Sequence, residues 1–408
     1  MTQPVNSTRL FNASCFALIT TAFSFSIRAG ILPQLGAEFN LTAAQLGFIN
    51  SMFFLGFPIS MVIGGLVYHT VGPRIIMQVA FVCHTIGILM TIYSGGYAGL
   101  LISTFFIGIG NGCTEAACNP MIADAYSGLK MNKMLNRFHM WFPGGIVVGS
   151  LISKFMTDAN LGWQAQIWVI MIPTVVYAFL FWGQAFPKPH IDGVSSIGEN
   201  IKAMFTPLFL FIFVCMMFTA ISEFGPQQWT GLIMSKSGAS PMLILALVTG
   251  LMAVMRFFAA PVVKLLGDTG ILWTASILTA IGIYLFSTVT GPTAYLAAVI
   301  FALGVGLFWP TMVGFVAQHV PLSGALGMSI IGGVGMLSTA IFQPIIGGWI
   351  DADTAEKAAL GLTGDQLELA AGQATLSTMI AFPAVLIVAF GILFFWMKGK
   401  KPAGVAAH

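Results

Sequence analysis

The chain has 408 residues, of which 57% are hydrophobic and only 7% are charged, and its formal net charge is +3. A soluble globular domain carries about 25% charged residues, so this composition excludes a soluble protein and indicates one whose solvent is the lipid bilayer. The small net charge predicts no nucleic-acid partner. Each helical span needs about 20 apolar residues, so the predicted spans use nearly the whole chain and leave no room for a soluble catalytic domain.

Twelve apolar segments follow one another along the chain, separated by short polar or Pro/Gly breaks, and each is predicted to be a transmembrane helix. They cover residues 11–36, 43–68, 74–94, 97–124, 134–157, 163–186, 206–233, 241–264, 270–290, 293–318, 325–350 and 374–397. The first is too long for the core of a cleaved signal, so it is interpreted as a span. The polar residues 351–373 are predicted to form a surface helix or loop.

Lysine and arginine residues are unevenly divided between the two sides of these segments. Of the 16 in the chain, eleven share a side with the N-terminus, three (Lys154, Lys236 and Lys357) lie on the other side, and Arg28 and Arg256 fall within spans. Because basic residues are retained in the cytoplasm, both termini are predicted to be cytoplasmic, which requires an even number of spans. The predicted location is a bacterial inner membrane.

The longest break on the predicted cytoplasmic side, residues 187–205, separates six spans in residues 1–186 from six in residues 206–408. Glycine patterns recur in corresponding spans of the two parts. They are Gly108-x-Gly110-x-Gly112 and Gly304-x-Gly306, and Gly144-Gly145 and Gly332-Gly333. We therefore predict an all-α polytopic membrane protein with twelve transmembrane helices in two pseudo-symmetric six-helix bundles, around a site near the bilayer midplane.

Four ionisable residues lie deep within predicted spans: Arg28, Glu115, Glu223 and Arg256. A charge at the centre of a membrane helix costs about 2.5–3.5 kcal/mol, so these residues are expected to face the bundle interior. Two of each sign permit buried salt bridges, but we favour a role in the solute pathway. Glu115 and Glu223 are predicted to couple transport to protons, together with His139 at the start of the fifth span.

Amides and tryptophans accompany these charges. Asn111, Glu115 and Asn119 are spaced to share one face of the fourth span, which should face a wet cavity or another helix. In the seventh span, Pro226 is expected to break the helix beside a second polar cluster. Such groups suit a polyhydroxylated ligand. The predicted substrate-binding residues are Arg28, Asn111, Asn119, Gln227, Gln228, Trp229, Arg256, Trp309 and Gln343.

No cofactor or metal is predicted. The five cysteines lie in apolar stretches without metal-ligand spacing and are interpreted as small buried residues. The Gly108–Gly112 cluster lacks the Lys-Ser/Thr of a phosphate loop, which argues against ATP-driven transport. An intramembrane enzyme needs a nucleophile–base pair or a metal site, and the sequence offers neither, so the chain is not predicted to be an enzyme.

The six-plus-six arrangement resembles the major facilitator superfamily over nearly the whole chain. Residues 65–74, Gly-Leu-Val-Tyr-His-Thr-Val-Gly-Pro-Arg, resemble the loop between its second and third spans. His69 stands where that family usually has an aspartate, and Thr70 where it usually has an arginine. The resemblance implies the major facilitator fold, whereas the two departures question the usual charge relay at this loop.

A narrower resemblance is to the fucose:proton symporter-like sugar transporters. It rests most on residues 108–120 of the fourth span, with weaker similarity at Leu32-Pro33, at Phe39–Gln45, at Glu223 with Trp229, and at residues 308–311. It implies proton-coupled sugar uptake in which Glu115 matches the family's fourth-span carboxylate. The chain has Arg28 where founding members carry an acidic first-span residue, and an arginine does not titrate near neutral pH.

The leading hypothesis is therefore a secondary active transporter that moves a sugar or sugar derivative by alternating access, as a proton-coupled symporter. Its partners would be a small solute, protons and the bilayer, and it would act as a monomer. A second hypothesis is transport of an organic anion such as a sugar acid, gripped by Arg28 and Arg256. A drug or metabolite exporter and a receptor that does not transport are two further hypotheses.

Overall fold

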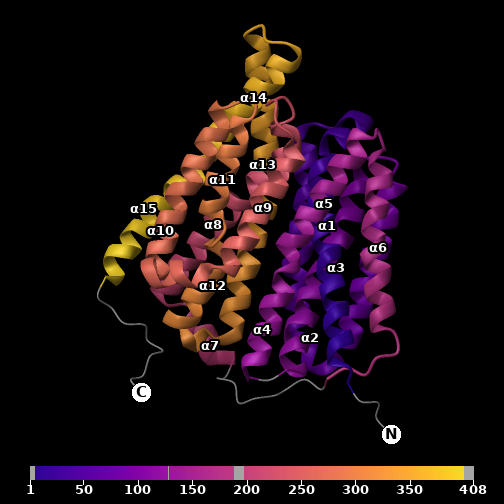
Figure 1. Ribbon diagram of the computed structural model, residues 1–408, viewed down its shortest axis with the longest axis vertical. Coiled ribbons are helices and arrows are strands. Elements are labelled where there is room, and N and C mark those ends of the chain that lie inside the picture. The colour runs from indigo at the N-terminus through magenta and orange to yellow at the C-terminus, as the bar shows by residue number, and fades with distance from the viewer. Residues whose placement is uncertain (1–4, 127, 188–196, 399–408) are drawn as a thin grey trace. The chain divides into compact units, whose positions relative to one another are not determined.

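The computed structural model describes residues 5–126, 128–187 and 197–398, and Figure 1 shows their helices. The helices are α1 (Ser7–Phe39), α2 (Ala43–Ile92), α3 (Tyr97–Ala125), α4 (Gly128–His139), α5 (Trp141–Asp158), α6 (Trp163–Phe181), α7 (Ile197–Met204), α8 (Pro207–Ile233), α9 (Pro241–Phe257), α10 (Ala259–Thr288), α11 (Thr293–Val305), α12 (Phe308–His319), the 3-10 turn η1 (Pro321–Ser323), α13 (Gly324–Ala359), α14 (Gly364–Met379) and α15 (Ala381–Met397).

Nine helical stretches within the described residues are long and apolar enough to cross a membrane. One of them, α2, contains 50 residues and holds two predicted spans. The shorter apolar helix α9 and the 18-residue α5 account for two further predicted spans. All twelve predicted spans thus correspond to helical segments, and the predicted class, an all-α polytopic membrane protein, is confirmed.

The chain divides into two compact units. The first comprises residues 1–192 with Gln343–Gly347, and the second comprises residues 193–342 and 348–408. In the first unit α1 packs against α5 and α6, and α2 packs against α3. In the second, α10 packs against α11 and α15, and α8 packs against α14 and α15. Nine of the 19 residues of the predicted linker, 187–205, lie outside the described residues, and α7 occupies eight of the others, so the limits of the linker remain a prediction.

Each unit contains a long helix with one non-helical glycine. Gly72 in α2 has φ 76° and ψ 162°, and Gly267 in α10 has φ 63° and ψ 172°. Positive φ is readily adopted only by glycine, which explains the residue at both positions. The chain segments predicted here as connections between spans are therefore one-residue interruptions rather than open loops.

Glycines also allow close helix contacts at corresponding positions. A methyl group on Gly110 of α3 would collide with the ring of His84, and one on Gly304 of α11 would collide with Thr279. The sequence interval between Gly110 and Gly304 matches, to within one residue, the interval between Gly72 and Gly267. The same interval thus relates backbone and packing features of both units, which supports an internal repeat.

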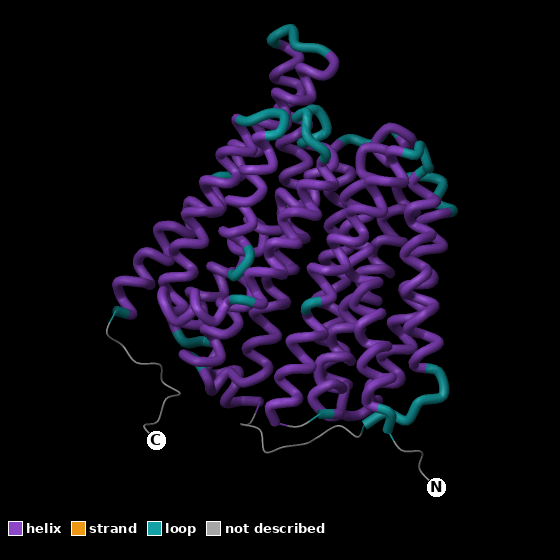
Figure 2. The backbone as a smooth tube through the Cα atoms, in the orientation of Figure 1, coloured by secondary structure: helices purple, strands orange, loops and turns teal. Residues whose placement is uncertain are grey.

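A helix break was predicted at Pro226 in the seventh span, and the structure does not have it. Helix α8 continues through Pro226, so the predicted break there is wrong. A membrane helix packed on its neighbours tolerates the loss of one backbone hydrogen bond at a proline. The tenth predicted span is instead interrupted at Gly306 and Leu307, between α11 and α12. Short loop segments of this kind are visible along the helices in Figure 2.

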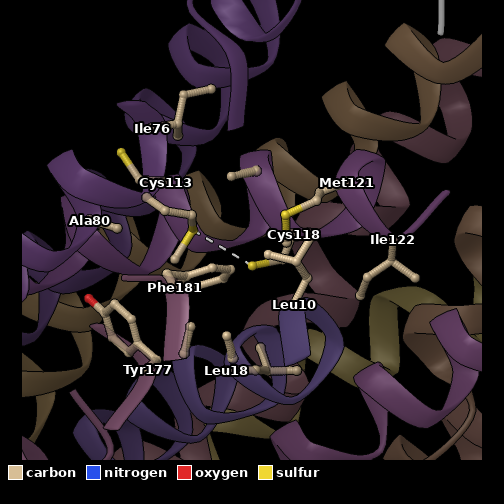
Figure 3. Close-up of a cluster of buried hydrophobic side chains, with 14 of the residues drawn as sticks. Leu10, Leu18, Ile76, Ala80, Cys113, Cys118, Met121, Ile122, Tyr177 and Phe181 are labelled. Carbon is tan, nitrogen blue, oxygen red and sulfur yellow. Dashed lines mark hydrogen bonds between the residues drawn. The ribbon is translucent and has the colours of Figure 1, made fainter. Parts of the chain in front are cut away.

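The core of the first unit is rich in sulfur. Side chains from α1, α2, α3 and α6 form the buried cluster of Figure 3. There the Cys118 thiol donates to Sδ of Met77 across 3.7 Å. All five cysteines of the chain are buried and free, which confirms their interpretation as small core residues.

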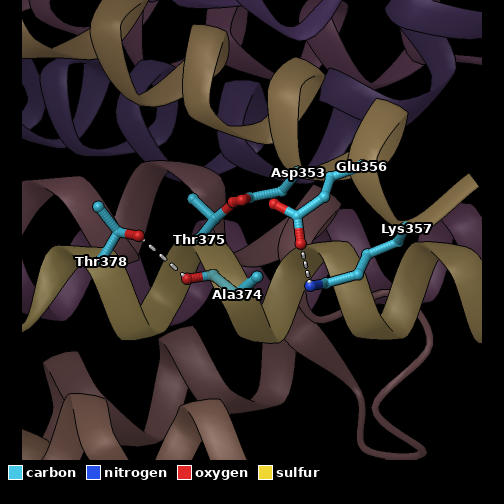
Figure 4. A network of polar contacts seen from close by, with 6 residues as sticks. All are labelled: Asp353, Glu356, Lys357, Ala374, Thr375 and Thr378. Atoms are coloured by element: carbon cyan, nitrogen blue, oxygen red, sulfur yellow. Dashed lines mark hydrogen bonds and ion pairs between the residues drawn. The ribbon is translucent and has the colours of Figure 1, made fainter. Parts of the chain in front are cut away.

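The polar residues 351–373 form the ends of two helices rather than an irregular loop. In Figure 1 α13 and α14 extend together beyond the neighbouring helices of their unit. The Thr375 hydroxyl donates to Asp353 Oδ2 across 2.6 Å, and Lys357 Nζ lies 2.8 Å from Glu356 Oε1 (Figure 4). The first of these bonds joins the two helices, which supports the predicted surface helix.

Candidate functional site

Arg28 lies in the C-terminal half of α1 and is only 6% exposed. Its guanidinium carbon is 3.7 Å from the centroid of the Phe53 ring and 5.9 Å from that of Phe54, both on α2. The ring of Phe25 packs edge-on against both phenylalanines. A desolvated cation over an aromatic face gains about 2 kcal/mol, which offsets part of the penalty for burying the charge.

The predicted polar face of the fourth span exists in α3, but its members have different partners. Asn119 donates through Nδ2 to Glu115 Oε2 across 2.6 Å, and both side chains are half-buried. The amide of Asn111 is instead fully buried and turned toward other helices. The predicted spacing therefore holds, but the face has two parts: the hydrogen-bonded side chains of Glu115 and Asn119, and the separately packed amide of Asn111.

Asn111 belongs to a buried network that joins four helices of the first unit. Its Oδ1 lies 2.9 Å from His84 Nε2, and the other ring nitrogen of His84 lies 2.9 Å from the Tyr177 hydroxyl. Asn111 also donates to the Ser24 hydroxyl across 3.4 Å. Tyr177 was not singled out in the sequence, since one tyrosine in an apolar span carries no signal that separates it from packing residues.

His139 lies at the last residue of α4 and is exposed, with its ring edge-on to Phe138 at a centroid distance of 5.1 Å. It does not join the buried network of the unit. The histidine in that network is His84, whose position within an apolar run was the available signal.

In the second unit, Arg256 connects three elements. Its Nη2 lies 4.0 Å from Glu223 Oε1, and its Nε donates to the Gly306 carbonyl across 3.0 Å. Glu223 is 3% exposed. Arg256 therefore both neutralises the carboxylate of α8 and provides a donor at the carboxyl end of α11, where a helix leaves carbonyls unsatisfied.

The other polar residues predicted for the second half lie near this group along α8 and on later helices. Gln227 and Gln228 are buried, and the former donates to Sδ of Met252 across 3.7 Å. The Trp229 ring is fully buried, and its indole N–H has no acceptor among the described residues. Trp309 packs edge-on against Phe224 with centroids 6.0 Å apart.

Gln343 lies in α13 and is fully buried, and neither polar atom of its side chain has a partner within the described part of the chain. An amide with neither polar atom bonded is rare in native proteins, which makes Gln343 a candidate to contact a polar group of a solute. Within the same described residues, no three His, Cys, Asp or Glu side chains are placed to hold a metal ion.

Buried charges, orphan donors and long apolar helices define the class of a polytopic membrane transporter. The family model described as Major Facilitator Superfamily matches residues 14–343, so the chain belongs to this superfamily. It is an integral membrane transporter and not an enzyme.

Two curated relatives come from Bacillus subtilis (strain 168). The protein named "Putative niacin/nicotinamide transporter NiaP" is 23% identical over 370 residues, which cover 86% of this chain and 90% of that protein. The hexuronate transporter is 25% identical over 182 residues, which cover 42% of this chain and 43% of that protein. The second similarity thus concerns under half of each chain.

Solved structures share the fold. The crystal structure of a D-xylose-proton symporter superposes with a TM-score of 0.77, covering 98% of this chain and 99% of that one at 15% identity. That of a point mutant of the nucleoside transporter NupG gives a TM-score of 0.78, covering 95% and 99% at 13% identity. At such low identity these structures establish the fold alone.

Proposed function

We propose that the protein is a proton-coupled symporter of a small organic carboxylate, with a sugar acid as the leading substrate class. The observation that carries the proposal is the burial of Arg28 within α1, on the rings of Phe53 and Phe54. A guanidinium in an apolar, low-dielectric setting binds a carboxylate strongly and in a fixed orientation. An ionisable residue inside a membrane is by default a candidate for function.

The names of the relatives support an anionic solute. They include transporters named for niacin and nicotinamide, for hexuronate and for ascorbate; niacin, hexuronate and ascorbate have acidic forms, whereas nicotinamide is neutral. A sugar acid also unites the two substrate classes predicted from the sequence, because it presents hydroxyls and a carboxylate together. The amides of Asn119, Gln227, Gln228 and Gln343, with the rings of Trp229 and Trp309, would contact its polar groups and its apolar faces.

Proton coupling is assigned first to Glu223. Protonation of this carboxylate would remove its attraction to Arg256, 4.0 Å away, and leave the arginine bonded to the Gly306 carbonyl at the helix break. One proton carried with one carboxylate moves no net charge, so the pH gradient drives accumulation, and each pH unit corresponds to about a tenfold concentration ratio. Glu115, bonded to Asn119, is the second candidate, and His139 is the third.

The proposed orientation has both termini in the cytoplasm of a bacterial inner membrane. The bias of lysine and arginine residues toward that side supports it. A monomer is proposed as the transporting form, and the narrower relation to fucose:proton symporters remains a prediction.

The test is uptake into proteoliposomes with an imposed inward proton gradient. Radiolabelled glucuronate and nicotinate should accumulate, whereas their neutral counterparts glucose and nicotinamide should not. Arg28→Gln should lower carboxylate uptake at least about tenfold, because a hydrogen bond to a charged group contributes about 1.5–3 kcal/mol. Protein-free liposomes control for passive entry of protonated acids.

Arg137→Gln is the matched control, since Arg137 is an exposed arginine on α4. It removes the same charge and should leave uptake unchanged. Equal uptake of the acids and the neutral solutes would refute the carboxylate assignment. Uptake that ignores the proton gradient would refute coupling.

A second candidate substrate is a neutral sugar. The buried indole N–H of Trp229 and the orphan amide of Gln343 favour it, because hydroxyls satisfy both kinds of group. Gradient-driven uptake of glucose or xylose that survives Arg28→Gln would select the neutral sugar.

A further inference from the structure

Asn50 is a buried polar residue of α2 that has no part in the site described above. It is completely inaccessible to solvent, and neither its amide nitrogen nor its carbonyl oxygen has a hydrogen-bond partner among the described residues. Both atoms lack partners, so the result does not depend on which way the amide is turned. Buried side-chain amides are nearly always bonded to protein or water, because an unsatisfied one destabilises the fold.

The same unit contains a buried amide with the opposite character. Asn111 is also completely buried, but it contacts His84 and Ser24 at hydrogen-bond distance. Asn111 therefore finds protein partners in the helical bundle that it helps to hold together. The amide of Asn50 does not, which distinguishes it from a packing residue.

The position of Asn50 connects it with Arg28. It precedes Phe53 and Phe54 by three and four residues, so the three side chains share one face of α2. Side chains of an α-helix lean toward its N-terminus, which directs the Phe53 ring back toward the turn of Asn50. That ring is the one on which the Arg28 guanidinium lies, at 3.7 Å.

We propose that Asn50 is a specificity-determining residue that hydrogen-bonds a polar group of the solute whose carboxylate Arg28 holds. The inference rests on the proposed function and adds a requirement to it. The ligand is a carboxylate that also carries a hydroxyl or a ring nitrogen. A carboxamide offers two N–H donors and one acceptor, so it satisfies a hydroxyl in both directions and a pyridine nitrogen through one donor.

The expected consequence is discrimination between cyclic acids that differ in their polar groups. A site that bonds a polar group of its ligand rejects the analogue without that group, because the buried protein atoms are then left unpaired. Two matched pairs test this: nicotinate against benzoate, and glucuronate against cyclohexanecarboxylate. The first pair differs only in one ring nitrogen.

The experiment measures binding of these four probes to the purified full-length protein, together with its thermal unfolding. The wild type should prefer the polar member of at least one pair about tenfold, a difference equivalent to about 1.4 kcal/mol. Asn50→Leu, which keeps the shape of the side chain, should abolish that preference and retain the apolar acid. Its unfolding temperature should equal or exceed that of the wild type, whereas Asn111→Leu should unfold at a lower temperature.

Each result decides the inference. A preference retained by Asn50→Leu, or absent from a wild type that binds carboxylates, overturns it and leaves the proposed function standing. A wild type that binds none of the four acids overturns both. If Asn50→Leu does not fold, Asn50→Ala takes its place, and failure of both variants to fold makes Asn50 structural and refutes the inference.

Discussion

Replacing Arg256 by methionine tests the arrangement of the second unit most directly. The substitution keeps an unbranched side chain of moderate length and removes the guanidinium. It leaves Glu223, whose side chain is 4% exposed, without its counter-charge, and the Gly306 carbonyl without its donor. We expect Arg256→Met to be strongly destabilising and to impair the coupling of uptake to protons.

The magnitude follows from the separation and the burial. Two unit charges 4.0 Å apart attract by about 4 kcal/mol at an effective dielectric constant of 20. Removal of one partner from a buried pair typically costs about 3–5 kcal/mol, since the remaining charge is uncompensated. The Arg256 side chain is 28% exposed, which favours the lower end of that range. About 3 kcal/mol corresponds to a fall of roughly 10 °C in unfolding temperature for a domain of this size.

A double-mutant cycle separates the pair from its surroundings. Thermal unfolding in one detergent is measured for the wild type, Arg256→Met, Glu223→Gln and the double variant. Because the double variant contains no buried unpaired charge, it should be more stable than Arg256→Met alone, by about 1–3 kcal/mol. Arg74→Met, at an exposed position of α2, is the control for loss of an arginine.

Two results would refute this reasoning. The first is a loss below about 1 kcal/mol for Arg256→Met, a magnitude typical of an exposed ion pair. The second is additivity of the two single substitutions, which would mean that Glu223 and Arg256 do not interact. Uptake adds an independent check: Glu223→Gln should abolish gradient-driven accumulation while exchange of solute across the membrane continues.

Three further predictions concern packing and surface contacts. In thermal unfolding, Gly304→Ala should destabilise the protein by about 1–3 kcal/mol through overpacking. Gly65→Ala is the control: the added methyl group meets open space, so this variant should be neutral or more stable by up to about 1 kcal/mol. Tyr177→Phe should lower stability by about 1–3 kcal/mol, because a buried histidine nitrogen loses its hydrogen-bond partner, and equal unfolding temperatures would contradict it. A hydrogen bond to Asp365 of α14 raises the pKa of Lys236. The pair therefore stabilises the fold fully below the ordinary lysine pKa, and this stabilisation is lost as pH rises through the raised pKa. The small loss of stability in Lys236→Gln at pH 7 should vanish in high salt.

Much of the fold was accessible from the sequence because its signals are local. A run of about 20 apolar residues predicts a span whatever it packs against, and all twelve predicted spans are helical. The interruptions of the helices were less accessible. Pro226 suggested a break that the structure lacks, while Gly306, which the sequence marked only as part of a recurring glycine pattern, lies at one that exists. Whether a helix bends at a given residue depends on its neighbours in space, which the sequence does not reveal.

The candidate site follows the same distinction. A charge within an apolar run is visible in the sequence, so Arg28 and Glu223 were found. Their partners were not all visible, because Phe53 resembles any other core phenylalanine until Arg28 is placed on its ring. Asn50 was visible as a polar residue within a span, but its lack of partners among the described residues appears only in three dimensions.

The internal repeat gives these residues a common explanation. The interval that relates Gly72 to Gly267 also relates Arg28 to Glu223, so equivalent positions of the first and seventh spans carry opposite charges. Glu115 and Trp309 likewise each follow a repeated glycine by three residues. Glycines recur because both units need the same backbone geometry and close helix contacts. At these positions the two units share geometry but differ in chemistry, which supports the proposal that a solute and a coupling ion, rather than packing, account for the buried charges.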